Sequence, residues 1–375
     1  MANLTAHPTR MKTKTLVLTL MALVSSHLVT QVSAAEIAAG INLDGWVDTV
    51  ATGTTNNNDE KLAGTNSTAS PSTTDFASSA LLRVGWQPTE KVAAVMSFRT
   101  PDDQGALEIN EAYGTVAPSD QWLIGAGKSY GPFGYFAAEP TGLYTVTNAL
   151  VANLYSVSPT GVWATCTPNE HVNVTLIVAD GLATDAFPGG KASADTNDVS
   201  PGLDVVWTPS SQLAMDFEAY ADPHAGGVDA DNNPGHIYTF GFNAQYTTDG
   251  LRIGVEALER ITQYAGTVST TGGDNADHHE FSWAAVVTGK LPESTPWPMS
   301  LSAQVSQLIN DQASGSASGN TLTKAQLALL TNPLTSTNFA ANIEVFYLQD
   351  GHGNPITDGA LDTYGVALEG LFVLK

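Results

Sequence analysis

The stretch HIYTFGFNAQYTTDGLRIGVEALER, residues 236–260, alternates apolar and polar side chains on both sides of a short polar turn. Before the turn, Tyr238, Phe240 and Phe242 occupy every second position, and after it aliphatic residues repeat the pattern. A period of two is typical of a β-strand with one apolar and one polar face. The stretch therefore predicts two strands joined by the turn TDG at 248–250.

The connections between such strands alternate in length along the chain. The short polar turns lie at 88–90, 118–120, 168–170, 209–211 and 248–250. The longer connections lie at about 53–75, 100–106, 131–156, 182–200, 222–235, 263–277, 310–320 and 350–360. An outer-membrane barrel has short turns at one end and longer loops at the other, whereas a β-sandwich has no reason to sort its connections in this way.

The number of strands must be even if both chain ends lie on the same side of the membrane. The clear alternations give fifteen strands, and the segment TLTKAQLALL at 321–330 supplies a sixteenth. If that segment is a loop, fourteen strands follow. The prediction is an all-β fold, a transmembrane antiparallel β-barrel of about sixteen strands.

The first residues resemble a secretory signal. Arg10, Lys12 and Lys14 precede an apolar run, and Val32-Ser33-Ala34 fits the small-residue cleavage pattern. We therefore expect residues 1–34 to be removed and residues 35–375 to form one barrel domain in the outer membrane of a Gram-negative bacterium.

The composition agrees with a barrel and excludes other classes. Residues 35–375 carry 11 basic and 37 acidic side chains, which argues against a nucleic-acid partner. Charged residues make up only 14% of the chain, and no run after the signal reaches the length of a membrane-spanning helix. With Cys166 as its single cysteine, the chain cannot form an intramolecular disulfide.

Aromatic residues gather beside the short turns, as expected for a belt at a membrane interface. These residues are Trp86, Trp122, Trp207, Tyr246 and Trp297. Outer-membrane lipid is therefore an expected partner of the barrel. The alternative is that these rings cap the core of a sandwich.

One segment resembles a known group of proteins. The sequence EAYGTV at 111–116, followed by AGKSYGPFGY at 126–135 and a long loop, is similar to the putative β-barrel porin families and the related siderophore-porin group. The resemblance implies that the third outer loop, 131–156, folds into the lumen and narrows it. The alternative is an ordinary outer loop that packs on its neighbours. Trimers are common among sixteen-stranded porins, so a homotrimer is expected by analogy only.

A constricted pore places acids on the loop opposite bases on the wall, and Glu139 is the expected loop acid. The bases and acids of the strands are expected to face the lumen, because a charged residue within a membrane strand is tolerated there. We expect replacement of Glu139 by Gln to lower the preference for cations. The expected constriction residues are Lys128, Tyr130, Phe133, Tyr135 and Glu139. The expected lumen charges are Arg83, Arg99, Glu108, Glu111, Asp216, Glu218, Arg252, Glu256 and Arg260. Further strand acids are Glu344 and Glu369. For each of these charges, the alternative is a salt bridge that supports the barrel without touching solute.

Three groups of residues resemble metal-binding or catalytic motifs, but none of them meets the requirements of such a site. Residues 229–240 lack the glycine and the final glutamate of a calcium-binding EF-hand loop, and adjacent histidines at 278 and 279 would point to opposite faces of a strand. No metal and no cofactor is expected. Ser282 and Ser302 could serve a barrel hydrolase together with histidines, but their spacing does not demand it, so we do not expect an enzyme.

The predicted function is passive diffusion of small hydrophilic solutes or ions through a water-filled pore. One alternative is a siderophore porin that takes up a ferric chelate. Another, from a different class, is a secreted β-sandwich adhesin or lectin that does not enter a membrane.

Overall fold

The computed structural model describes residues 35–56, 72–100, 107–130, 145–154, 159–180, 199–228, 234–263, 278–292, 298–310, 320–331, 338–351 and 361–374. Within these ranges the chain forms one antiparallel sheet and a short 3-10 helix, η2 (Leu150–Leu154). None of the described helices is long and apolar enough to cross a membrane.

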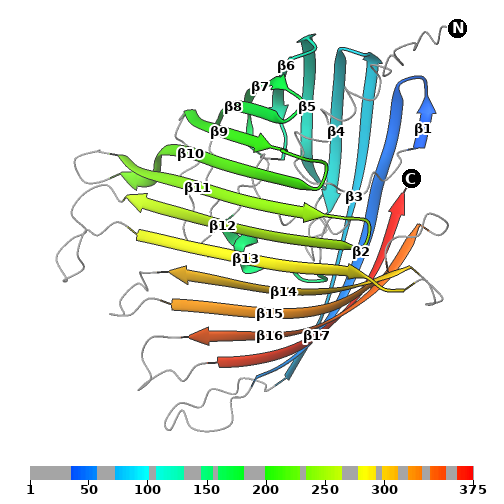
Figure 1. Cartoon of the computed structure of the whole chain (residues 1–375), viewed down its shortest axis with the longest axis vertical. Helices are drawn as coiled ribbons and strands as arrows, with labels where there is room; N and C mark the ends of the chain where they lie inside the picture. Colours follow the sequence, from blue (N-terminus) through cyan, green and yellow to red (C-terminus); the bar gives the residue numbers. More distant parts are fainter. Residues whose placement is uncertain are drawn as a thin grey trace, which may run out of the picture.

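The strands follow one another around the sheet in chain order (Figure 1). They are β1 (Ala35–Ala38), β2 (Ile41–Asn56), β3 (Ser72–Thr89), β4 (Val92–Thr100), β5 (Glu108–Ser119), β6 (Trp122–Lys128), β7 (Thr160–Asn169), β8 (Val172–Asp180), β9 (Val199–Trp207), β10 (Leu213–Val228), β11 (Pro234–Thr247), β12 (Leu251–Gln263), β13 (His278–Lys290), β14 (Met299–Asn310), β15 (Asn320–Thr331), β16 (Phe339–Gly351) and β17 (Leu361–Leu374).

The sheet closes where β17 pairs with β2, which lie side by side in Figure 1. The pairing of β17 ends with Leu374 opposite Gly45, and β1 then continues along β2 with Ala35 opposite Leu43. Because β3 pairs along the other edge of β2, β1 and β17 share one position in the ring. The barrel therefore has sixteen strands around its circumference.

The segment 321–330 is part of β15, so the sixteen-strand prediction is confirmed and the fourteen-strand alternative is wrong. In β15, Ala325 and Leu327 are exposed on one face, while Gln326 and Ala328 are buried on the other. The alternation that predicts the strand thus also predicts which of its side chains lie on the outer face and which on the inner face.

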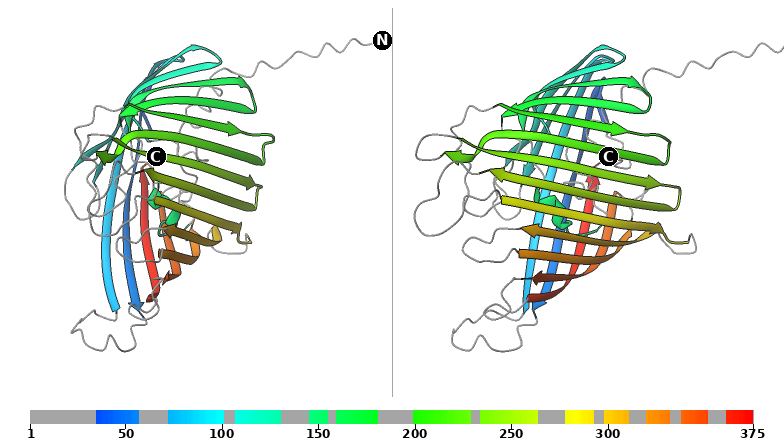
Figure 2. Two further views of the ribbon diagram at one scale, coloured as in Figure 1. Left: turned by 90° about the vertical axis from the view of Figure 1, so that its left-hand side faces the viewer. Right: turned by 60° about the vertical axis from the view of Figure 1, so that its left-hand side comes forward.

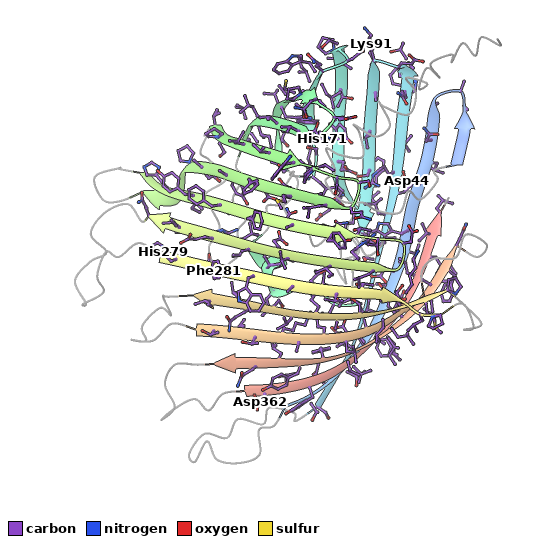
Figure 3. The ribbon with its side chains drawn as sticks, in the orientation of Figure 1. Asp44, Lys91, His171, His279, Phe281 and Asp362 are labelled. Carbon is purple, nitrogen blue, oxygen red and sulfur yellow. The ribbon has the colours of Figure 1, made fainter. Side chains whose placement is uncertain are left out.

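The two faces of the barrel have opposite polarity. On β10 and β11 the exposed face carries Phe217 and Phe240, which are 47% and 48% exposed, whereas Asp216 and Glu218 on the inner face are each 4% exposed. Phe281 on β13, labelled in Figure 3, is likewise exposed, at 39%. Exposed apolar side chains on the outer face are unfavourable in water and favourable against hydrocarbon.

The same polarity excludes the β-sandwich alternative. In a sandwich the apolar faces of two sheets meet in a dry core. Here one closed sheet points its apolar face outward, with no second sheet among the described residues to cover it. The prediction of a sandwich adhesin or lectin is therefore wrong.

The predicted aromatic belt lies at the end of the barrel that carries the short turns. Trp86, Trp122, Trp207 and Tyr246 stand within a few residues of those turns and are between 39% and 50% exposed. Trp297 lies outside the described residues. Exposed indole and phenol rings near the strand ends suit the boundary between lipid and water.

The seam between the first and last strands is packed from inside. Trp46, Leu81, Leu371 and Val373 form a buried apolar cluster with Ala340. Each of these side chains is at most 4% exposed, so the cluster stabilises the closure of the sheet without a disulfide.

One part of the inner wall is shaped by a glycine. Trp163 on β7 lies over Gly125 on β6, where a Cβ atom would come within 2.1 Å of the indole ring. Trp163 also meets Tyr113 on β5 edge to face, with ring centroids 5.6 Å apart. The missing side chain at Gly125 therefore lets an aromatic ring lie flat against the wall.

Candidate functional site

Residues 145–154, between β6 and β7, lie against the inner face of the barrel. The carboxylate of Glu344 on β16 accepts hydrogen bonds from the backbone N–H groups of Val146, at 2.6 Å, and Thr147, at 3.1 Å. The hydroxyl of Thr147 donates to the other oxygen of the same carboxylate. Glu344 is 0% exposed, so this charge is compensated by hydrogen bonds to the segment. We call residues 145–154 the crossing segment.

Two neighbouring strands, β15 and β14, also hold the crossing segment by polar contacts. On β15, Gln326 donates to the Thr147 carbonyl at 2.7 Å and Lys324 donates to the Asn148 carbonyl at 2.8 Å. On β14, the Ser306 hydroxyl accepts from the Leu150 N–H at 3.1 Å.

At its far end the segment reaches β12 and β13. Arg260 on β12 donates to the Leu154 carbonyl at 2.8 Å, and it also forms an ion pair of 3.7 Å with Glu280 on β13. The basic side chain thus links the wall to the end of η2.

Apolar contacts complete the attachment. From the segment, the buried residues Ala149, Val151 and Leu154 pack against the wall. The wall residues of this cluster are Leu258, Ala284 and Val286. The segment covers this apolar patch of the inner wall and so shields it from water.

The crossing segment lies far around the ring from the strands that it connects. It joins β6 to β7, yet it contacts strands from β12 to β16, which are on the opposite side of a sixteen-strand ring. Figure 2 shows η2 on the inner side of those strands. The described part of the connection between β6 and β7 therefore lies on the inner face of β12 to β16.

The predicted inward loop spans 131–156, and only part of it is described. Phe133, Tyr135 and Glu139 lie outside the described residues. Their part in a constriction stays a prediction.

Two of the predicted constriction residues are described. Lys128 pairs in register with Ala112 and Thr160, and its ammonium group donates to the Ile109 carbonyl at 2.8 Å. The Tyr130 hydroxyl accepts from the side-chain amide of Asn110. Lys128 thus contacts the backbone of β5, near the end of β6, and a direct role for it in the constriction stays a prediction.

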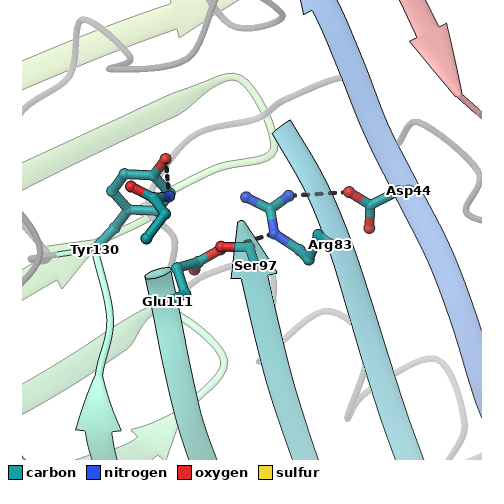
Figure 4. Close-up of polar contacts among 6 residues, drawn as sticks. Asp44, Arg83, Ser97, Glu111 and Tyr130 are labelled. Carbon is teal, nitrogen blue, oxygen red and sulfur yellow. Dashed lines mark hydrogen bonds and ion pairs between the residues drawn. The ribbon is translucent and has the colours of Figure 1, made fainter. Parts of the chain in front are cut away.

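A separate polar network lies on β2 to β5 (Figure 4). Arg83 donates from Nε to Glu111 at 2.8 Å and forms an ion pair of 3.2 Å with Asp44. Ser97 donates to the same oxygen of Glu111 at 2.8 Å. The predicted lumen charges Arg83 and Glu111 are therefore brought together as an ion pair on the inner wall.

The other predicted lumen charges are spread around the ring. Asp216, Glu218, Glu256 and Arg260 are buried on the inner face of β10 and β12, and Arg252 shares the inner face of β12. Arg99 stacks over the Trp46 ring, 5.9 Å from its centroid, and the exposed Glu108 stands opposite Arg99 in register. Whether these charges act on a solute stays a prediction.

Sequence reasoning missed several inner-face charges. These are Asp44, Asp48, Asp204, Glu280 and Lys324. The signal was present for Asp204, because it stands between the outward residues Leu203 and Val205 in an alternating stretch.

The two serines considered for a hydrolase have structural partners. The Ser282 hydroxyl donates to the Gln307 carbonyl at 2.7 Å, and Ser302 shares a hydrogen bond of 2.9 Å with Thr288. Neither contact involves a histidine.

Comparison with solved structures identifies the architecture. The outer membrane channel DcaP of Acinetobacter baumannii matches with a TM-score of 0.59 and 11% identity over 91% of this chain and 100% of that chain. The chain has the fold of outer-membrane porins. OmpF of Salmonella typhi (TM-score 0.59, 12% identity) covers 90% of this chain and 100% of its own.

An anion-selective porin from Comamonas acidovorans also matches, with a TM-score of 0.58 and 10% identity, over 89% of this chain and 99% of that chain. No protein-family model and no curated protein sequence matches the chain. At these identities the likeness establishes the porin fold, and the solute must be inferred from this chain's own residues.

Proposed function

We propose that the protein is an outer-membrane porin through which small hydrophilic solutes and ions diffuse passively down their gradients. The observation that carries this proposal is the inverted polarity of a closed barrel, with an exposed apolar outer face and a charged inner face. A wall of this kind suits lipid outside and water inside.

The crossing segment is the proposed constriction. It lies on the inner face of β12 to β16 and is fastened there by Glu344, Gln326 and Arg260. A fixed obstacle in a wide barrel limits the size of passing solutes, and charges beside it bias which of them enter. In this proposal Glu139, on the undescribed part of the same loop, adds to the charge at the narrowest point.

Conductance measurements in planar lipid bilayers test the proposal. Purified protein should give stepwise increases in current, and the step size should rise in proportion to salt concentration, as for a water-filled pore. Protein that inserts into the bilayer without current steps would overturn the proposal. Swelling of liposomes in sugars of increasing size would then give the size limit of the pore.

The same measurement separates a general porin from a siderophore porin. A chelate that binds in the lumen should block the current in a saturable way. With ferric citrate as the probe, we expect no saturable block, and a saturable block would favour chelate uptake instead.

Localisation and assembly are part of the proposal. OmpT of Vibrio cholerae, 13% identical with a TM-score of 0.53, is described in a trimer form. We expect this chain to reach the outer membrane after cleavage behind Ala34 and to assemble as a homotrimer. N-terminal sequencing of the membrane-extracted protein and light scattering in detergent test the two expectations.

A further inference from the structure

Carboxylates gather on the inner face of neighbouring strands from β9 to β12. Asp204 on β9 stands opposite Glu218 on β10. Asp216 on β10 stands opposite Asn243 on β11, which in turn stands opposite Glu256 on β12. Each of the four acids is 3% or 4% exposed. We call Asp204, Asp216, Glu218 and Glu256 the carboxylate wall.

Two acids of the wall, Asp204 and Asp216, each have one carboxylate oxygen without a donor among the described residues. Asn243 donates to Asp216 Oδ2 at 3.1 Å and to Glu218 Oε1 at 3.4 Å. The Oδ1 atoms of Asp204 and Asp216 have no hydrogen-bond donor among the described residues, although both side chains are more than nine-tenths buried. A buried acceptor without a donor attracts a positive partner.

The backbone leaves room for one of these carboxylates. Gly241 on β11 stands opposite Glu218 on β10, and a Cβ atom at Gly241 would lie 2.6 Å from Glu218 Oε2. The Glu218 carboxylate therefore extends over Gly241 toward β12.

Two arginines of β12, Arg260 and Arg252, lie near the carboxylate wall. Arg260 on β12 pairs with Glu280 and donates to the Leu154 carbonyl, and Arg252 lies on the other side of Glu256 along the same strand. Among the described charged residues, the buried base is Arg260, and ten acids are buried. These acids are Asp48, Glu111, Asp204, Asp216, Glu218, Asp222, Glu256, Glu280, Glu344 and Glu369.

Charges that are shielded from water are weakly screened by salt, and a channel lined by one sign of charge concentrates the opposite ion. We propose that the carboxylate wall makes the pore prefer small cations, both inorganic and ammonium-bearing, over anions. This inference rests on the proposed porin function and names the class of solute. Since no group of three or more His, Cys, Asp or Glu among the described residues is arranged to hold a metal ion, the wall acts through its field and not by chelation.

The test is the reversal potential of single channels in a potassium chloride gradient. The unmodified protein should show preference for potassium. The triple variant Asp204→Asn, Asp216→Asn, Glu218→Gln keeps the side-chain shapes and removes up to three negative charges. Its potassium-to-chloride permeability ratio should fall by about threefold or more, because a single-sign lining raises counter-ion concentration by about tenfold or more.

A matched control removes the same formal charge elsewhere. Glu90→Gln, Glu170→Gln and Asp249→Asn change exposed acids at three short turns. This control should leave the permeability ratio almost unchanged. If both triple variants change the ratio equally, or if the wall variant does not change it, the role of the wall is overturned.

A simpler variant covers a failure of the triple variant to fold. Asp216→Asn alone, which retains an oxygen to accept from Asn243, should lower the ratio in the same direction by a smaller factor, and an unchanged ratio would overturn the role of the wall. Current steps with no cation preference in the unmodified protein overturn this inference but leave the porin function standing. Protein without current steps overturns both.

Discussion

Glu344 on β16 accepts a hydrogen bond of 2.6 Å from the backbone N–H of Val146, although 198 residues separate the two in the sequence. The same carboxylate accepts from the N–H and the hydroxyl of Thr147. A carboxylate that is completely buried needs such donors, and a segment that is not part of the sheet needs an anchor on the inner wall. The contact satisfies both needs at once.

Replacing Glu344 by Gln should loosen the crossing segment. The neutral amide loses the charge that strengthens three hydrogen bonds, and its NH₂ group cannot accept from Val146 or Thr147. A loss of about 2 kcal/mol would raise the population of the detached segment about 30-fold. The measurement is the rate at which maleimide labels Val151→Cys, introduced at a position that is 0% exposed, in a Cys166→Ala background.

Glu369→Gln is the matched control for this experiment. Glu369 is also a buried inner-face acid, and its described hydrogen bond comes from Asn342 on the neighbouring strand. Its replacement should leave the labelling rate unchanged. Equal rates in the two variants would mean that Glu344 does not hold the segment.

Leu258→Ala should weaken the apolar part of the same attachment. Leu258 is 1% exposed and packs in the cluster that contains Val151 and Leu154. Removing its buried methyl groups costs about 2 kcal/mol or more. The current through single channels should become noisier, as the segment moves more often. Leu251→Ala, at a position on the same strand that is 38% exposed, is the control and should leave the noise as in the unmodified protein.

Gly125→Ala should disturb the packing of Trp163. The new Cβ atom would overlap the indole ring, which must move and lose its edge-to-face contact with Tyr113. Overpacking of this kind costs about 1–3 kcal/mol. The near-ultraviolet circular dichroism should change, and the unfolding free energy should fall. Gly85→Ala, where nothing lies within 4 Å of the new atom, should change neither quantity.

Much of the fold could be predicted because successive side chains of a strand point to opposite faces of the sheet. An apolar and polar alternation therefore shows both where a strand lies and which of its residues face the lumen. The alternation predicts that Asp216 and Glu218 face the lumen, and the structure places both on the inner face. The parity of connection lengths then selected a barrel, and β15 followed from the need for an even number of strands. Each of these arguments uses information local to one strand or to one turn.

The candidate site was harder to predict because its contacts are long-range. Glu344 could be identified as an inward acid, but nothing in its neighbourhood names Val146 as its partner. The apolar inner residues Leu258, Ala284 and Val286 break the polar pattern only because the crossing segment covers them. Such a pairing depends on where a loop meets distant strands, and alternation within a strand carries no information about that contact.

The orientation of the barrel in lipid gives the last prediction. Leu176, in the middle of β8, is 57% exposed on the outer face, and Val172 begins the same strand on the same face beside a short turn. An arginine at the midplane of a bilayer costs about 2–4 kcal/mol, whereas near the interface it costs about 0–1 kcal/mol. Leu176→Arg should therefore lower the free energy of unfolding in lipid vesicles by about 2–4 kcal/mol and Val172→Arg by much less. If both variants lose the same stability, depth in the membrane does not govern the cost, and the outer face of β8 does not contact hydrocarbon.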